Sequence, residues 1–111
     1  MDKETELYFL NILQENHIWY QVGGLRYSGN DEYHNWYKIG YNEKNIIGEI
    51  EFSKNPTWRV SYYKNGRTYY DSGFLVSNTQ RLINLYNNYC LPGIKLKKID
   101  EKKAEIEKDF I

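Results

Sequence analysis

Few residues of this chain have the types and spacing that acid–base chemistry or metal binding requires. His34 lies close to Asp31 and Glu32, and a histidine that a carboxylate orients can act as a general base or a metal ligand. A polar loop that leads into a strand explains the same three residues, and we favour that interpretation. The other histidine, His17, is interpreted as a residue at the end of a helix. We therefore expect no catalytic residue and no metal site.

A second candidate is a pair of carboxylates. Glu49 and Glu51 are two residues apart, so on a strand they share one face. Close carboxylates can serve acid–base or metal chemistry. The strand alignment given below places Lys38 opposite Glu49 and Arg59 opposite Glu51, which favours an exposed sheet face that carries ion pairs. Such surface pairs contribute about 0.2 to 1 kcal/mol each.

The single cysteine, Cys90, can form neither an intramolecular disulfide nor a thiolate cluster for a metal. It has no activating neighbour in the sequence, and we interpret it as a buried packing residue. The glycines at 23, 24 and 29 match no nucleotide-binding fingerprint, so no cofactor is expected. The lone cysteine, the acidic N-terminus and the lack of a long apolar run favour a cytoplasmic protein that does not contact the membrane.

Length and composition predict one folded domain. The chain has 111 residues, of which 41% are hydrophobic and 17% aromatic, so it can build one two-layer core. We expect a single α+β domain over residues 1–93, with residues 94–111 as a peripheral charged helix or tail. Fifteen basic and fifteen acidic side chains cancel, so no global field would hold a polyanion or an anionic membrane.

Turn signals align four antiparallel strands. Asn65-Gly66 predicts a type I′ hairpin that pairs Tyr62 with Tyr69 and Tyr63 with Thr68. Two further registers are assumed at the loops 42–45 and 53–57. They pair Tyr41 with Ile46, and Phe52 with Trp58.

Because side chains alternate along a strand, this alignment assigns each residue to a core face or a solvent face. The core face collects Tyr37, Ile39, Tyr41, Ile46, Ile50, Phe52, Trp58, Val60, Tyr62 and Tyr69. The solvent face collects Trp36, Lys38, Ile47, Glu49, Glu51, Arg59, Ser61, Tyr63, Thr68, Tyr70 and Ser72.

Two helices should cover the core face. The first is predicted from a cap at Asp2 to about residue 15, with an apolar side made of Leu7, Phe9, Leu10 and Leu13. A strand at 18–22, broken by the two following glycines, and a polar loop at 28–32 come next. The second helix is predicted to follow a capping box at 77–80 and to end at 91–93. The architecture is then an antiparallel sheet of four to five strands with helices on one face.

The exposed sheet face suits either a protein or a nucleic-acid partner. Aromatic and basic residues on a sheet can stack single-stranded bases, but the two glutamates and the zero net charge oppose phosphate binding. Tyrosine, tryptophan and arginine are also the residues enriched at protein-binding hot spots, and we favour a protein partner. The loop at 28–34 and the tail are alternative surfaces. The expected partner-binding residues are Trp36, Lys38, Glu49, Glu51, Arg59, Tyr63 and Tyr70.

One stretch adds a family resemblance. Residues 57–89, TWRVSYYKNGRTYYDSGFLVSNTQRLINLYNNY, run through a strand, a Gly66-Arg67 turn, a second strand and a helix. This layout resembles the C-terminal half of small immunity proteins from bacterial polymorphic-toxin and contact-dependent inhibition systems. The resemblance implies a non-enzymatic α+β domain that neutralises a cognate toxin by occlusion. A phage- or mobile-element-encoded inhibitor of a host defence enzyme would have the same features. The neutral charge departs from the acidic surface typical of inhibitors of nuclease toxins.

Overall fold

The computed structural model describes residues 3–29 and 31–93. Its elements are α1 (Lys3–Glu15), β1 (Trp19–Gly29), β2 (Glu32–Asn42), β3 (Asn45–Glu51), β4 (Thr57–Lys64), β5 (Arg67–Phe74), α2 (Leu75–Leu85) and the π-helical turn η1 (Tyr86–Cys90). The predicted α+β fold, with a helix on either side of the sheet in sequence, is confirmed. The predicted cap at Asp2 and the tail at 94–111 lie outside the described residues.

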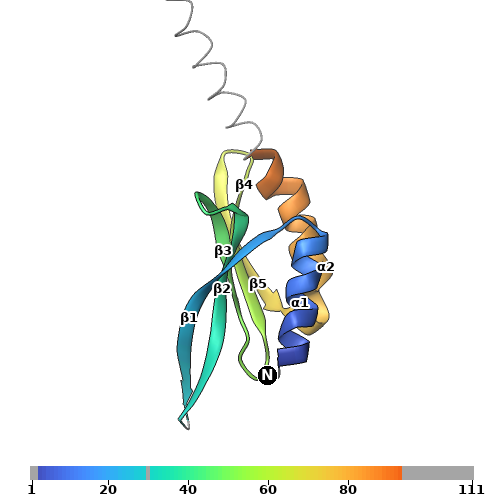
Figure 1. The fold of residues 1–111 in the computed structure, drawn as a ribbon. Helices are drawn as coiled ribbons and strands as arrows, with labels where there is room; N and C mark the ends of the chain where they lie inside the picture. The colour runs from blue at the N-terminus through green and yellow to red at the C-terminus, as the bar shows by residue number, and fades with distance from the viewer. Residues whose placement is uncertain (1–2, 30, 94–111) are drawn as a thin grey trace, which may run out of the picture.

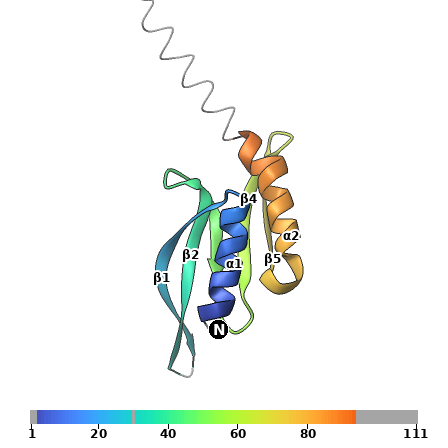
Figure 2. The same ribbon diagram turned by 45° about the vertical axis from the view of Figure 1, so that its right-hand side comes forward.

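The five strands form one antiparallel sheet in the order β1-β2-β3-β4-β5. Both helices lie on the same face of this sheet, and no described element covers the other face (Figures 1 and 2). We call the face under the helices the inner face and the uncovered one the outer face. An antiparallel sheet tolerates one solvated face because its side chains alternate between core and water.

The core lies between the inner face and the two helices. Alternate positions of the central strands supply Ile39, Ile50, Trp58 and Val60, which are all nearly inaccessible to solvent. The helices and adjoining segments add Phe9, Leu10, Leu13, Leu75, Leu82, Ile83 and Tyr86. Burying side chains of this size stabilises a fold by about 1.5 to 3 kcal/mol each. Leu7 was expected on the apolar side of α1, but it is exposed.

The β4–β5 hairpin has the predicted register. Tyr62 pairs with Tyr69 and Tyr63 with Thr68, and Asn65 and Gly66 have the positive φ values, 51° and 81°, that a type I′ turn needs.

The register between β2 and β3 differs from the prediction near the turn. Gly40, and not Tyr41, pairs with Ile46, and register shifts lie on both sides of this pair. The shift moves Ile46 to the outer face, where it is 46% exposed, while Ile47 packs against the core. The two isoleucines therefore exchange the roles that strict alternation gave them.

The register between β3 and β4 slips by two residues from the prediction. Trp58 pairs with Ile50, and β3 ends at Glu51, so Phe52 has no partner on β4; its backbone N–H donates to Asn35 O of β2 at 2.9 Å. Glu49 consequently lies opposite Arg59, and the predicted pairing of Glu51 with that arginine is wrong. A slip of two residues keeps every side chain on its predicted face.

Strand β1 is longer than expected. It continues through the glycines at 23 and 24 to Gly29, with a register shift between Val22 and Gly24 opposite β2. Gly24 has a φ of 140°, a conformation that side chains rarely adopt. The two glycines therefore form a bulge inside a strand and do not end it.

Helix α2 begins at Leu75, before the predicted capping box. Leu75 is buried and its N–H donates to Pro56 O at 2.9 Å, so core packing fixes the start without a side-chain cap. Asn78 departs from helical geometry and kinks the helix. Residues 91–93 are still helical, and 93 is the last described residue before the tail, so the predicted end at 91–93 stays a prediction.

Candidate binding face

Two groups of side chains occupy the outer face. Over β1–β3 lies a set of mutually bonded polar residues, which we call the ion-pair network: Arg26, Ser28, His34, Glu49 and Glu51. Over β4 and β5 several residues are exposed, and three of them form what we call the aromatic patch: Arg59, Tyr63 and Tyr70.

Arg26 is the centre of the ion-pair network. Its Nη1 donates to Glu49 Oε1 at 3.0 Å and to Glu51 Oε1 at 2.6 Å, and its Nη2 donates to Glu49 Oε2 at 2.7 Å. Its guanidinium carbon lies 4.3 Å from the centroid of the Trp36 ring. The planar guanidinium suits such forked bonding and stacking. The Arg26 side chain of β1 thus extends across β2 and bonds two residues of β3.

The strand register explains this convergence. Arg26 pairs with His34 across β1 and β2, while Trp36 pairs with Glu51 across β2 and β3. These residues all point to the outer face, so the arginine can pass over the tryptophan to both carboxylates. Its bonds to Glu49 and Glu51 raise the pKa of Arg26. Hydrogen bonding from Arg26, aided by His34, lowers the pKa of Glu51.

His34 contacts different partners from those expected. Its Nδ1 contacts the Ser28 hydroxyl and its Nε2 lies 3.4 Å from Glu51 Oε1, whereas Asp31 and Glu32 do not orient it. A hydroxyl, an imidazole and a carboxylate in line can relay a proton. Here the Glu51 Oε1 atom already accepts the shorter hydrogen bond from Arg26. We therefore interpret these three residues as a structural part of the ion-pair network. Among the described residues, no cluster of three or more His, Cys, Asp and Glu side chains could hold a metal.

A shallow hollow of about 350 Å³ lies between the two groups. Its lining includes β3 at Gly48 and the two isoleucines at 46 and 47. Five of the expected partner-binding residues line it: Trp36, Lys38, Glu49, Arg59 and Tyr70. The structure therefore brings most of the predicted set around one concave surface.

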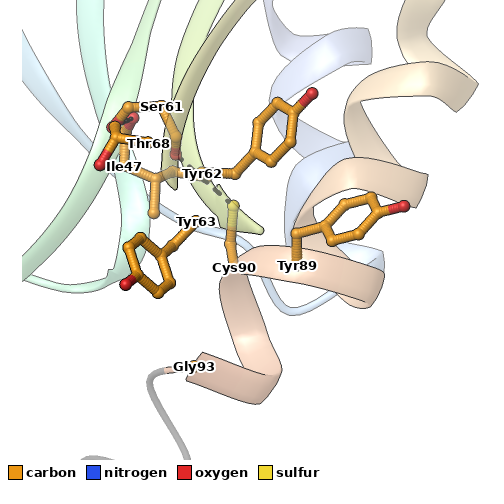
Figure 3. A pocket seen from close by; sticks show the side chains of 8 residues that line it. All are labelled: Ile47, Ser61, Tyr62, Tyr63, Thr68, Tyr89, Cys90 and Gly93. Atoms are coloured by element: carbon orange, nitrogen blue, oxygen red, sulfur yellow. Dashed lines mark hydrogen bonds between the residues drawn. The ribbon is translucent and has the colours of Figure 1, made fainter. Parts of the chain in front are cut away.

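The two remaining expected residues lie apart from this hollow. Tyr63 is exposed and lines a second hollow between the β4–β5 hairpin and η1 (Figure 3). Glu51 belongs to the ion-pair network, where Arg26 takes the role that was expected of Arg59.

The second hollow also contains Cys90, whose predicted burial is confirmed. Its Sγ points to Ser61 O at 3.8 Å (Figure 3). Burial raises the pKa of the thiol to about 11, so it is a packing group and a poor nucleophile. Beside it, Tyr62 stacks on Tyr89 and on Tyr69, with ring centroids 5.2 and 5.6 Å apart.

Sequence reasoning missed the residues of β1 beyond the bulge. Arg26 and Ser28 point to the outer face, whereas Leu25 and Tyr27 point to the inner face. Tyr27 meets Tyr33 there at 5.3 Å between ring centroids, and both rings are exposed. The signal was available, because residues 25–28 continue the alternation of apolar and polar side chains that a half-buried strand requires.

Comparisons of the chain with protein-family models, with curated proteins and with solved structures give no match. Within residues 3–29 and 31–93, no helix is both long and apolar enough to cross a membrane.

Proposed function

We propose that this chain is a non-enzymatic protein-binding module of the immunity type. It neutralises a bacterial toxin domain or another enzyme in the cytoplasm by covering the active site of that protein in a stoichiometric complex. The observation that supports this most is the exposure of Tyr63 and Tyr70, 64% and 79% respectively, on a sheet face that no described element covers.

The aromatic patch has the physical properties of a binding hot spot. A tyrosine offers a large apolar ring and a hydroxyl, and it loses little rotamer entropy when a partner immobilises it. Tyr63 and Tyr70 stand on regular paired strands, so their backbone is already ordered before binding. The lining of the adjacent hollow includes apolar residues, so the hollow can receive an apolar side chain of the partner.

The charges around the hollow indicate the chemistry of the partner. Arg26 holds Glu49 and Glu51, so these carboxylates are occupied within the chain itself. Lys38 and Arg59 remain on the rim, and one of them, Arg59, is exposed. A partner surface that combines apolar and acidic side chains is therefore complementary to this face.

The position of one lysine side chain counts against the nucleic-acid alternative. Lys64 follows Tyr63 directly and could have contacted a phosphate, but its Nζ lies 5.2 Å from the Tyr89 ring centroid on the helix side. The outer face thus offers fewer cations than the sequence suggested, and phosphate contacts dominate nucleic-acid affinity. An inhibitor carried by a phage or mobile element would use the same face against a different enzyme.

The test is neutralisation in cells. We expect the gene beside that of this chain to encode a toxin-like protein and the chain to protect cells that produce it. The double variant Tyr63→Ala/Tyr70→Ala should lose this protection. The matched control is Tyr27→Ala/Tyr33→Ala, because these two tyrosines have similar exposure but lie on the inner face. The control variant should protect as well as the wild type.

Two results would contradict the proposal. In the first, neither the wild-type chain nor the control variant protects the cells. In the second, the purified chain shifts single-stranded RNA or DNA at physiological salt and the Tyr63→Ala/Tyr70→Ala variant does not, which would favour the nucleic-acid alternative.

A further inference from the structure

Strand β5 is an open edge of the sheet. It is last in the strand order, and in the part of the chain that the structure describes no strand pairs with the edge of β5 that faces away from β4. Its register with β4 runs without interruption from Thr57–Phe74 to Lys64–Arg67. The other edge strand, β1, is interrupted by register shifts between Val22 and Gly24 and near Gly29. Bulges protect an edge against pairing, and a long regular edge is open to it.

The hairpin register fixes which backbone groups of β5 face outward. In a two-residue hairpin the residues that flank the turn, here Lys64 and Arg67, hydrogen-bond to each other through both backbone groups. Along the two strands, hydrogen-bonded and non-hydrogen-bonded pairs then alternate. Thr68, Tyr70 and Ser72 therefore point their N–H and C=O groups away from β4.

One of these outward groups is already used. The N–H of Ser72 donates to Asp71 Oδ1 at 2.9 Å, and Asp71 Oδ2 lies 2.6 Å from Arg81 Nη2. Thr68 and Tyr70 thus keep both their donors and their acceptors available at the edge.

The free backbone N–H and C=O groups of Thr68 and Tyr70 in one copy are complementary to the same groups in a second copy. We propose that β5 pairs antiparallel with β5 of a second copy of this chain, with Tyr69 opposite Tyr69 at the two-fold axis. Thr68 of each copy then bonds to Tyr70 of the other through both backbone groups. This register leaves the capped N–H of Ser72 outside the ladder. It also sets Arg67 opposite Asp71 of the other copy, so opposite charges meet on both sides of the axis.

The neighbouring register fits less well. If Tyr70 lay on the axis, Thr68 would oppose Ser72, whose N–H Asp71 already holds. It would also place Tyr69 opposite Asp71 and leave Arg67 without an opposite charge. Both registers use the same four N–H groups, but only the register with its axis at Tyr69 leaves no Thr68 carbonyl opposite an N–H that is already held, and it also pairs the charges.

The helices permit this arrangement. Helix α2 packs over both β4 and β5, and strands in a sheet are about 4.8 Å apart. Two copies of α2 on either side of the axis would therefore lie roughly 10 Å apart, which is a normal helix packing distance. The paired copies would share one continuous sheet with their outer faces on the same side. This inference does not depend on the proposed function, because Tyr63 and Tyr70 stay on the outer face in either state.

A matched pair of variants at Thr68 tests the proposal by light scattering at high protein concentration. The wild type should have the mass of two chains. Thr68→Pro removes the outward N–H without breaking the ladder to β4, and should be monomeric. Thr68→Val keeps that N–H and should remain dimeric. A monomeric wild type, or a Thr68→Pro variant that is folded by circular dichroism and still dimeric, would overturn the proposal.

A cross-link tests the register. Tyr69→Cys places two thiols at the axis, within the Cα separation that a disulfide allows. Under mild oxidation it should form a covalent dimer efficiently, while Tyr63→Cys, which is exposed but far from the axis, should not. Equal cross-linking of the two variants would show random collision and would rule out this pairing.

Discussion

The ion-pair network and the aromatic patch lie on the same face of the same sheet. The polar groups of the network bond to one another, whereas the side chains of the patch are exposed to solvent. In the network, Arg26 bonds two carboxylates and stacks on Trp36, and His34 is held between a hydroxyl and a carboxylate. In the patch, Tyr63 and Tyr70 extend into solvent. Groups that the chain satisfies by itself contribute to stability, whereas exposed aromatic groups gain most from a partner. The comparison predicts that substitutions in the two regions affect different measurements.

The largest effect on stability is expected at the centre of the network. Arg26→Ala leaves Glu49 and Glu51 close together without their counter-charge and uncovers Trp36. Hydrogen bonds to charged groups are worth about 1.5 to 3 kcal/mol, and partial solvent exposure reduces this, so we expect a loss of about 2 kcal/mol in the free energy of unfolding. Urea denaturation measures it. Arg59→Ala is the matched control in the patch and should change stability by less than about 0.5 kcal/mol.

An intermediate effect is expected at the hairpin, where neighbouring tyrosines face opposite sides. Tyr69 stacks on Tyr62, and aromatic pairs contribute about 0.5 to 1.5 kcal/mol beyond burial. Tyr69→Ala should therefore lower the unfolding free energy by about 1 kcal/mol, while Tyr70→Ala should leave it nearly unchanged. Equal losses in the two variants, measured by thermal denaturation, would contradict the assignment of the two faces.

The smallest effect is the pH dependence that Glu51 confers. Its pKa is lower in the folded protein because Arg26 and His34 bond the charged form. A lowered pKa contributes stability that is fully present above the unfolded pKa of about 4.3 and is lost as the pH falls through the folded value. Glu51→Gln should therefore make the unfolding free energy less sensitive to acidification below about pH 5. A variant that loses stability in acid as steeply as the wild type would rule out this contribution.

The sequence predicted the fold better than the pairing of charges, for identifiable reasons. Alternation assigned Trp58, Val60 and Tyr70 to their correct faces, because a two-residue slip between strands does not change a face. The same slip changed which residues lie opposite each other, so Glu51 lost its predicted partner Arg59. The loop was assumed to run from Ser53 to Thr57, but β3 ends at Glu51 and β4 begins at Thr57, and no turn signal in residues 52–56 fixed this register in advance.

The network was missed for a different reason. Its central arginine comes from a strand that was expected to end at the glycines at 23 and 24, because paired glycines usually mark a turn. In the structure they form a bulge, and the alternation that resumes after it places Arg26 on the outer face. Arg26 and His34 come from two other strands to the carboxylates of β3. Such contacts between residues far apart in the sequence leave no local sequence pattern.

The most direct test of the proposed binding face is a calorimetric titration of the partner into two single variants. Tyr70→Ala should raise the dissociation constant at least about 30-fold, as expected for a hot-spot residue. Tyr33→Ala, an exposed tyrosine on the inner face, should bind like the wild type, and both variants should keep the stability of the wild type. Unchanged affinity in Tyr70→Ala, or an equal loss in Tyr33→Ala, would show that the partner does not bind at the aromatic patch.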